Sequence, residues 1–118
     1  MKLVLGLLLV LVGACSKSDE QAPYKPAPSL VPETELKRGR DACAAYVAKV
    51  CKCAETTPSF AEQCRLAKAL PEALEVDQSV GTAPGVEQKD STSLAFAVRK
   101  TIKSCIDQTA KLLAQGCN

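Results

Sequence analysis

Apolar residues recur at helical spacing in three stretches of the chain, and no stretch alternates between apolar and polar residues as a half-buried strand does. We expect Asp90 or Ser91 to cap the start of the last stretch and Gly116 to end it. In this stretch six apolar or small residues step by three or four positions and share one face of a helix: Leu94, Val98, Ile102, Cys105, Thr109 and Leu112.

The first predicted helix covers residues 33–53. Gly39 is expected to weaken this helix by about 1 kcal/mol relative to alanine. A Thr-Thr-Pro run over residues 56–58 ends the helix and begins the next segment. The predicted core face holds five residues, with Tyr46 at its flank: Leu36, Cys43, Val47, Val50 and Ala54.

The second predicted helix starts near Pro58, because proline suits a first helical turn, and Ser59 with Glu62 resembles a capping box. Pro71 either kinks this helix or begins another short helix that contains Leu74. Its apolar face holds Phe60, Cys64, Ala67 and Leu70. A loop is predicted over residues 78–90, which contain Gly81, Pro84 and Gly85.

The first 15 residues have a different pattern from the rest of the chain. Lys2 precedes an apolar run over residues 3–12, which would cover only about 15 Å as a helix. The hydrocarbon core of a bilayer is about 30 Å thick, so this run is too short to cross it. A cationic start before a short apolar run is typical of a secretory signal peptide.

The residues Val12-Gly13-Ala14-Cys15 resemble the lipobox of bacterial lipoproteins. This resemblance, which covers residues 1–15, implies cleavage between Ala14 and Cys15 and acyl chains on Cys15. Residues 1–14 would then be the signal peptide, and lipid would hold the mature protein in a membrane of the cell envelope. Ser16 resembles the sorting pattern that favours the outer membrane of a Gram-negative cell over its inner membrane, with the domain on the periplasmic or surface face.

Residues 15–34 are predicted to form a tether between the lipidated cysteine and a folded domain. The composition favours an extended or disordered chain that reaches up to about 50 Å from the membrane. Its polar residues are interrupted by four prolines, each of which blocks helix formation: Pro23, Pro26, Pro28 and Pro32.

Apart from Cys15, the chain holds six cysteines, an even number that is typical of three disulfides in a small exported domain. The domain has few aromatic residues and a thin predicted core, so disulfides would supply much of its stability. The expected fold class is all-α: a small disulfide-stapled bundle of three to four helices over residues 35–118, behind a disordered tether. The six residues are Cys43, Cys51, Cys53, Cys64, Cys105 and Cys117.

Several pairings of these cysteines are possible, and two are worth stating. In an up-down-up bundle the end of the first helix meets the start of the second. That arrangement suggests Cys53–Cys64, Cys43–Cys105 and Cys51–Cys117. The cysteine spacings also loosely resemble the twin-cysteine hairpins of small oxidised helical proteins, some of which carry copper. This second resemblance implies Cys43–Cys117, Cys53–Cys105 and Cys51–Cys64.

Cys51 and Cys53 form a C-x-C pair with two interpretations. As thiolates they could bind a soft metal such as Cu(I) or act as a redox dithiol. Residues two apart on a helix point about 200° apart, so on a continuous helix each would bond to a different neighbouring helix. We interpret both as structural half-cystines and expect no metal site and no cofactor. Metal handling or thiol redox chemistry through this pair is the alternative.

The rest of the composition argues against several classes of function. The chain contains no histidine, which removes the usual base of serine and cysteine nucleophiles and the commonest metal ligand. Without Lys2, 14 basic and 13 acidic residues nearly balance, so no nucleic-acid partner is expected. Carboxylates at Glu72, Glu75 and Asp77 are interpreted as a solvated helix face.

These observations predict a membrane-anchored envelope lipoprotein that acts as a binding or interaction module and is not an enzyme. Besides the membrane, which it contacts through its N-terminal lipid, the expected partner is an envelope protein or a peptide. A purely structural envelope lipoprotein is a further alternative.

Overall fold

The computed structural model describes residues 29–118. The described part contains four α-helices, one short 3-10 helix and no strand. The fold is therefore all-α, as the sequence predicts. The elements are α1 (Glu33–Thr56), η1 (Pro58–Phe60), α2 (Ala61–Ala67), α3 (Ala69–Gly81) and α4 (Gln88–Leu112).

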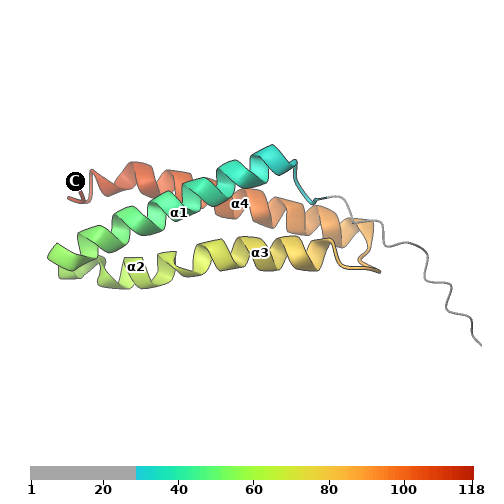
Figure 1. Cartoon of the computed structure of the whole chain (residues 1–118), viewed down its shortest axis with the longest axis horizontal. Helices are drawn as coiled ribbons and strands as arrows, with labels where there is room; N and C mark the ends of the chain where they lie inside the picture. Colours follow the sequence, from blue (N-terminus) through green and yellow to red (C-terminus); the bar gives the residue numbers. More distant parts are fainter. Residues whose placement is uncertain (1–28) are drawn as a thin grey trace, which may run out of the picture.

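The helices form a bundle of three rods in which α2 and α3 lie end to end and together make one rod (Figure 1). This rod runs antiparallel to α1 and α4, which run parallel to each other. Only Lys68 separates α2 from α3, and its backbone stays in the helical region (φ −60°, ψ −22°). Pro71 lies in the first turn of α3, where its missing N–H group costs no helical hydrogen bond. Of the two roles predicted for Pro71, the structure shows the beginning of a separate helix.

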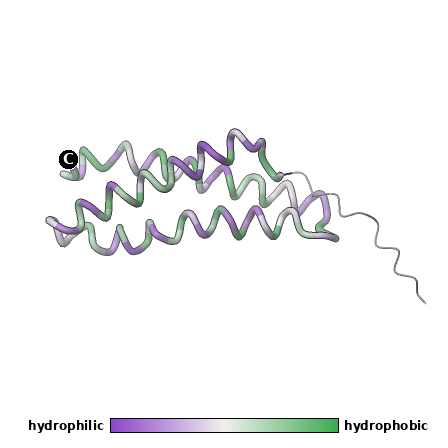
Figure 2. The backbone as a smooth tube through the Cα atoms, viewed as in Figure 1, coloured by the Kyte–Doolittle hydropathy of each residue, from purple (hydrophilic) through white to green (hydrophobic). Residues whose placement is uncertain are grey.

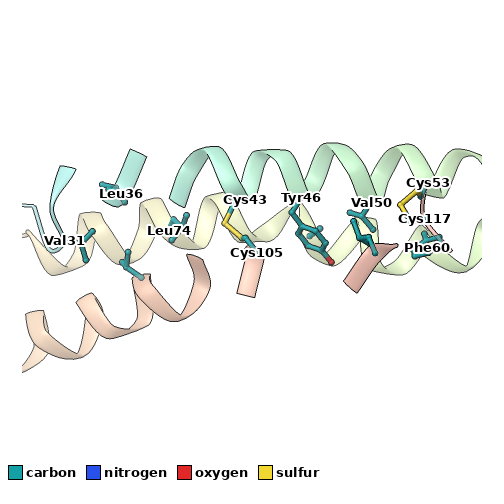
Figure 3. Close-up of a cluster of buried hydrophobic side chains, with 13 residues drawn as sticks. Val31, Leu36, Cys43, Tyr46, Val50, Cys53, Phe60, Leu74, Cys105 and Cys117 are labelled. Carbon is teal, nitrogen blue, oxygen red and sulfur yellow. A yellow bond between two sulfur atoms is a disulfide. The ribbon is translucent and has the colours of Figure 1, made fainter. Parts of the chain in front are cut away.

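The core is a stripe of residues that step by three and four positions along α1. Figure 2 shows hydrophobic and hydrophilic residues alternating along each long helix, as the burial of one face requires. Steps of three and four give a mean period near 3.5 residues, the spacing of helices that pack as in a coiled coil. The stripe is Leu36, Gly39, Cys43, Tyr46, Val50 and Cys53, and it packs against Leu74, Val98, Cys105 and Leu112. Figure 3 shows five residues of this stripe, Leu36, Cys43, Tyr46, Val50 and Cys53, with Leu74 and Cys105.

This stripe corrects the predicted core face of α1. Val47 and Ala54, which were expected in the core, are only partly buried. Tyr46 and Cys53 take their places and are 3% and 9% exposed. The predicted face and the observed stripe both satisfy helical periodicity. The observed stripe is the one buried because α2 and α4 pack on opposite flanks of α1.

Gly39 also has a different role from the predicted one. It lies on the buried face of α1, where an ideal Cβ would overlap the Cδ1 and Cγ1 atoms of Ile102. The absence of a side chain allows α1 and α4 to approach closely here. The glycine is therefore a packing residue and not only a weak point in the helix.

The helix starts differ from the predicted caps. No side chain caps α2, and Glu62 forms an ion pair with Arg65 where a capping box was expected. The α4 helix starts at Gln88, before Asp90 and Ser91, and also lacks a side-chain cap. The Ser91 hydroxyl donates instead to the carbonyl oxygen of Gly81 (3.2 Å). Because α3 persists to Gly81, the connecting loop covers only residues 82–87 of the predicted 78–90.

The end of α4 follows the prediction for Gly116. This residue has φ +88°, a conformation that glycine adopts without steric cost. The Cys117 amide donates to Leu112 O (2.9 Å), and the Gly116 amide donates to Leu113 O (3.1 Å). These two bonds form the Schellman motif that ends many helices. The motif turns the chain so that Cys117 points back into the bundle, where it is fully buried.

Residues 29–32, which we call the strap, belong to the folded part. Val31 is 2% exposed and lies in the core, and Leu30 fills the space above Gly81. The Gln78 amide donates to the Ser29 hydroxyl (2.8 Å). The predicted boundary between tether and domain at residue 34 is therefore too late by several residues. Residues 1–28, with the predicted signal peptide and most of the tether, lie outside the described part.

Two pairs of charged residues join the helices at the surface. Arg40 of α1 donates to both carboxylate oxygens of Glu75 in α3 (2.6 and 3.0 Å). Arg99 of α4 donates in the same way to Glu35 of α1 (2.8 and 3.2 Å). The hydrogen bonds from these guanidinium groups hold the pKa values of Glu75 and Glu35 below their ordinary range. Within residues 29–118 no helix is both long and apolar enough to span a membrane.

Candidate functional site

All six cysteines of the described part form disulfides, in the pairs Cys43–Cys105, Cys51–Cys64 and Cys53–Cys117. The disulfide-stapled bundle is therefore confirmed. Each of the two pairings considered from the sequence contains one correct pair: Cys43–Cys105 in the first, and Cys51–Cys64 in the second. The other pairs are wrong because Cys53 belongs to the buried stripe that meets the end of α4, whereas Cys51 lies on the flank that faces α2.

The C-x-C pair is divided between two disulfides. Cys51 bonds to Cys64 of α2, and Cys53 bonds to Cys117, which lies beyond the end of α4. Their angular separation on a continuous helix predicts different partner segments. In this state neither sulfur is a thiolate, which is the form that binds metal or attacks a disulfide. No group of three or more Cys, Asp or Glu residues among the described residues is arranged to hold a metal ion.

Two other sets of predicted residues have different outcomes. Ala14 and Cys15 lie outside the described residues, so cleavage and lipidation stay predictions. Of the three carboxylates assigned to a solvated face, Glu75 is held by Arg40, and it acts as a link between α1 and α3.

One surface cleft lies beside the strap and has a volume of about 570 Å³. Its walls come from the strap, the loop 82–87 and the first turns of α4, and the exposed ring of Phe96 stands at its side. Most of its polar groups already have partners within the protein. Ser91 donates to Gly81 O, Thr92 donates to Gln88 O (2.9 Å), and Arg99 is bound to Glu35. Few polar atoms are left there to orient a ligand.

The second cleft lies between α2 and α4, over α1, and has a volume of about 320 Å³. We call it the amide groove because three glutamines line it. Its apolar surface comes from α2 and the start of α3: Leu66, Ala67 and Leu70. Its polar surface comes from Tyr46, Gln63, Ser104, Gln108 and Gln115.

The amide groove exists because α2 and α4 both pack on α1 but not on each other. No Cα atom of α2 lies within 8 Å of a Cα atom of α4 in the described part of the chain. Tyr46 lies on α1 between these two helices, and its ring is buried in the core (Figure 3). Its hydroxyl is the part of the side chain that reaches the groove and hydrogen-bonds to Gln63 (3.0 Å).

The groove holds more hydrogen-bonding capacity than the protein uses. Gln63 donates to the Tyr46 oxygen and to Gln115 Oε1 (3.4 Å), so the Tyr46 hydroxyl proton has no acceptor among the described residues. The side chains of Ser104 and Gln108 make no hydrogen bond with any described residue. The Tyr46 hydroxyl proton, the Ser104 hydroxyl and the Gln108 carboxamide are thus free to bind a ligand that carries both donors and acceptors.

Sequence reasoning missed this groove. Tyr46 was placed at the flank of a core face, and the glutamines fit the polar faces of their helices. Only one signal was present in the sequence: Ser104 and Gln108 lie four residues apart, on one face of α4.

No family model, curated protein or solved structure matches this chain.

Proposed function

We propose that the protein is a lipid-anchored protein of the bacterial cell envelope whose helical domain binds a partner. The observation that carries the binding role is the amide groove, in which a buried tyrosine hydroxyl and free carboxamides face an apolar surface. Ligand sites combine an apolar lining with a few convergent polar groups in this way. The anchor is supported by Val12-Gly13-Ala14-Cys15, and Ser16 favours the outer membrane in a Gram-negative cell.

The three disulfides support both parts of this proposal. They suit an exported protein, because disulfides persist in oxidising compartments. They also fix the helices that line the groove. Metal handling or redox chemistry by Cys51 and Cys53 has less support, because both sulfurs are bonded to other cysteines and thiolate chemistry would first require reduction.

The anchor is tested by an intact mass of the detergent-extracted protein, with thiol alkylation before reduction. A mass that starts at Cys15, with acyl chains and no alkylated thiol, is the expected result. Cys15→Ser should release the protein from the membrane or trap the uncleaved precursor, whereas Ser18→Ala should change neither. A Cys15→Ser protein that is processed and membrane-bound like the parent would overturn the anchor.

The binding role is tested by crosslinking the full chain in intact cells of its host. We expect one or a few envelope components to be captured by the wild-type protein. Recovery of nothing above the level of an unrelated lipid-anchored domain would count against a binding module and in favour of a purely structural lipoprotein.

A further inference from the structure

We propose that the amide groove binds a short, uncharged segment of peptide in an extended conformation. This inference rests on the proposed binding function and names the ligand class for it. Its starting observation is the gap between α2 and α4, at the base of which the Tyr46 hydroxyl accepts a hydrogen bond from Gln63.

Disulfides fix both walls of the groove to the helix beneath it. Cys51–Cys64 joins α1 to α2, with Cα atoms 4.7 Å apart, and Cys43–Cys105 joins α1 to α4, with Cα atoms 4.9 Å apart. No disulfide joins the two walls to each other. Each wall is held at a fixed point on α1, so a ligand pays little conformational entropy to order the backbone of the site.

The lining carries no charge. Its polar groups are one phenol, one hydroxyl and three carboxamides, and each carboxamide presents a donor and an acceptor side by side. A peptide backbone has the same alternation of N–H and C=O groups. A ligand with a net charge would lose hydration on entering the groove without gaining an ion pair. Charge complementarity therefore favours a neutral peptide segment.

The apolar surface gives a peptide a place for its side chains. Leu66 is 56% exposed, and it lies in the groove beside Ala67 and Leu70. An extended peptide points alternate side chains to opposite faces, so every second residue could pack on these apolar groups. The residues between them would face solvent and tolerate variation.

The length of the groove matches a few residues of extended chain. Along the end of α4 and the turn that follows it, the groove extends from Ser104 to Gln115, about 16 Å at 1.5 Å per residue. An extended peptide rises about 3.3 Å per residue, so four or five residues would cover this distance. The volume of 320 Å³ lies near the lower end of the range of ligand pockets.

The position of the tyrosine favours a peptide over a carbohydrate. Sugars commonly pack the apolar face of a ring on an exposed aromatic face. Tyr46 is 3% exposed and is the one aromatic residue that lines the groove, so it presents its hydroxyl and not its ring. A donor at the base of the groove suits a peptide carbonyl oxygen.

The test is an NMR titration of the full, disulfide-bonded protein in detergent, labelled with ¹⁵N. One probe is a pool of N-acetylated, C-amidated pentapeptides built from uncharged residues. A second pool is identical except for Asp or Lys at its central position, and a third probe is a set of neutral oligosaccharides. We expect the neutral peptide pool to shift the side-chain amide signals of Gln63, Gln108 and Gln115.

Two variants and a control connect binding to the groove. Tyr46→Phe keeps the buried ring and removes the hydroxyl, and Gln108→Leu removes a free carboxamide. Each should weaken peptide binding roughly threefold to tenfold, the effect of one hydrogen bond, without lowering the melting temperature by more than a few degrees. Gln88→Leu is the matched control, because Gln88 is a glutamine of α4 that lines the other cleft.

Several outcomes would overturn the inference: no shift at millimolar peptide, shifts outside the groove, equal binding of the charged pool, or binding of the oligosaccharides alone. An envelope partner that is captured equally by wild type, Tyr46→Phe and Gln108→Leu would also overturn it, and would leave the proposed binding function standing. Failure of the wild-type chain to capture any partner counts against the proposed function, while the peptide titration still decides the ligand class of the groove.

Discussion

Gly39 of α1 lies directly against Ile102 of α4, and an ideal Cβ on the glycine would overlap the isoleucine side chain. Two other links between these parallel helices, and a third from α1 to Cys117 beyond the end of α4, have nearly the same offset along the chain. Glu35–Arg99, Cys43–Cys105 and Cys53–Cys117 join residues 62 to 64 positions apart. One register therefore holds an ion pair, a glycine contact and two disulfides.

Replacement of Gly39 by alanine should destabilise the protein, although alanine is the better helix former. Overpacking against Ile102 costs about 1–3 kcal/mol, which exceeds the gain in helix propensity of about 1 kcal/mol. Thermal unfolding monitored by circular dichroism should show a lower melting temperature. In an Ile102→Ala background the same glycine replacement should cost less than in wild type, because the two overlapping atoms are then absent. A Gly39→Ala protein more stable than wild type would show that the helices can move apart freely.

Loss of a disulfide should cost more stability for the two long-range pairs than for Cys51–Cys64. The separations are 62 and 64 residues for the long-range pairs and 13 residues for Cys51–Cys64. With the other two bonds intact, either long-range bond closes only the ring made of segments 43–53 and 105–117, roughly 24 residues, so the loop-entropy account gives a difference of roughly 0.5 kcal/mol. Denaturant unfolding of paired Cys→Ala variants, one pair at a time, gives the comparison. Equal losses for all three pairs would mean that residual structure in the unfolded chain dominates.

The strap should contribute to stability although it follows a proline-rich sequence. Val31→Ala removes methyl groups that are 98% buried, and its expected cost is about 1–2 kcal/mol. Val80→Ala is the matched control, because Val80 is 49% exposed and its truncation should change stability by less than about 0.5 kcal/mol. The two free energies of unfolding should therefore differ clearly, and similar values would place the start of the folded domain after residue 31.

Acid should weaken the link between α1 and α3. The pKa of Glu75 is lowered by its hydrogen bonds from Arg40, so the ionised carboxylate stabilises the folded state. This contribution is fully present above the ordinary pKa of 4.5 and is lost as the pH falls through the lower folded-state value. Because both side chains are partly exposed, at least 40% in each case, we expect a contribution of at most about 1 kcal/mol.

The measurement is the free energy of unfolding of wild type and Glu75→Gln at pH 6 and at pH 3. The gap between the two proteins should be present at pH 6 and should shrink at pH 3. Glu72→Gln serves as the control, because Glu72 makes no ion pair with any described residue. A gap that is the same at both pH values would show that the carboxylate acts through packing and not through its charge.

The helices were predictable because their signals are local. Val98, Cys105 and Leu112 are spaced by seven residues and are all buried, as the periodicity of the last segment indicates. Gly116 could be recognised because glycine has little competition at a helix end that needs a positive φ. The need for disulfides also followed from the small size of the predicted core.

The phase of the core on α1 could not be predicted, because Val47 and Tyr46 are both suitable core residues. The same uncertainty decides whether Cys51 or Cys53 faces α2. In the first predicted pairing the core face was rotated slightly from its observed position, so Cys64 and Cys117 were assigned to the wrong members of the C-x-C pair. The burial of Val31 could not be predicted, because this residue lies in a proline-rich stretch that was expected to be unfolded. The amide groove depends on two helices that do not meet, which is a property of the assembled bundle and not of either helix pattern.

The order of the crosslinks also determines how the domain responds to a pulling force. A pulling force on the strap can unwind α1 only as far as Cys43. At that residue the Cys43–Cys105 disulfide passes the force to α4. The force then divides between the segments 43–53 and 105–117, which Cys53–Cys117 closes into a covalent ring. Tyr46, Ser104 and Gln108 lie within or next to this ring, so the groove should keep its shape under tension. The part of the bundle between these two disulfides should therefore keep a nearly constant length under tension.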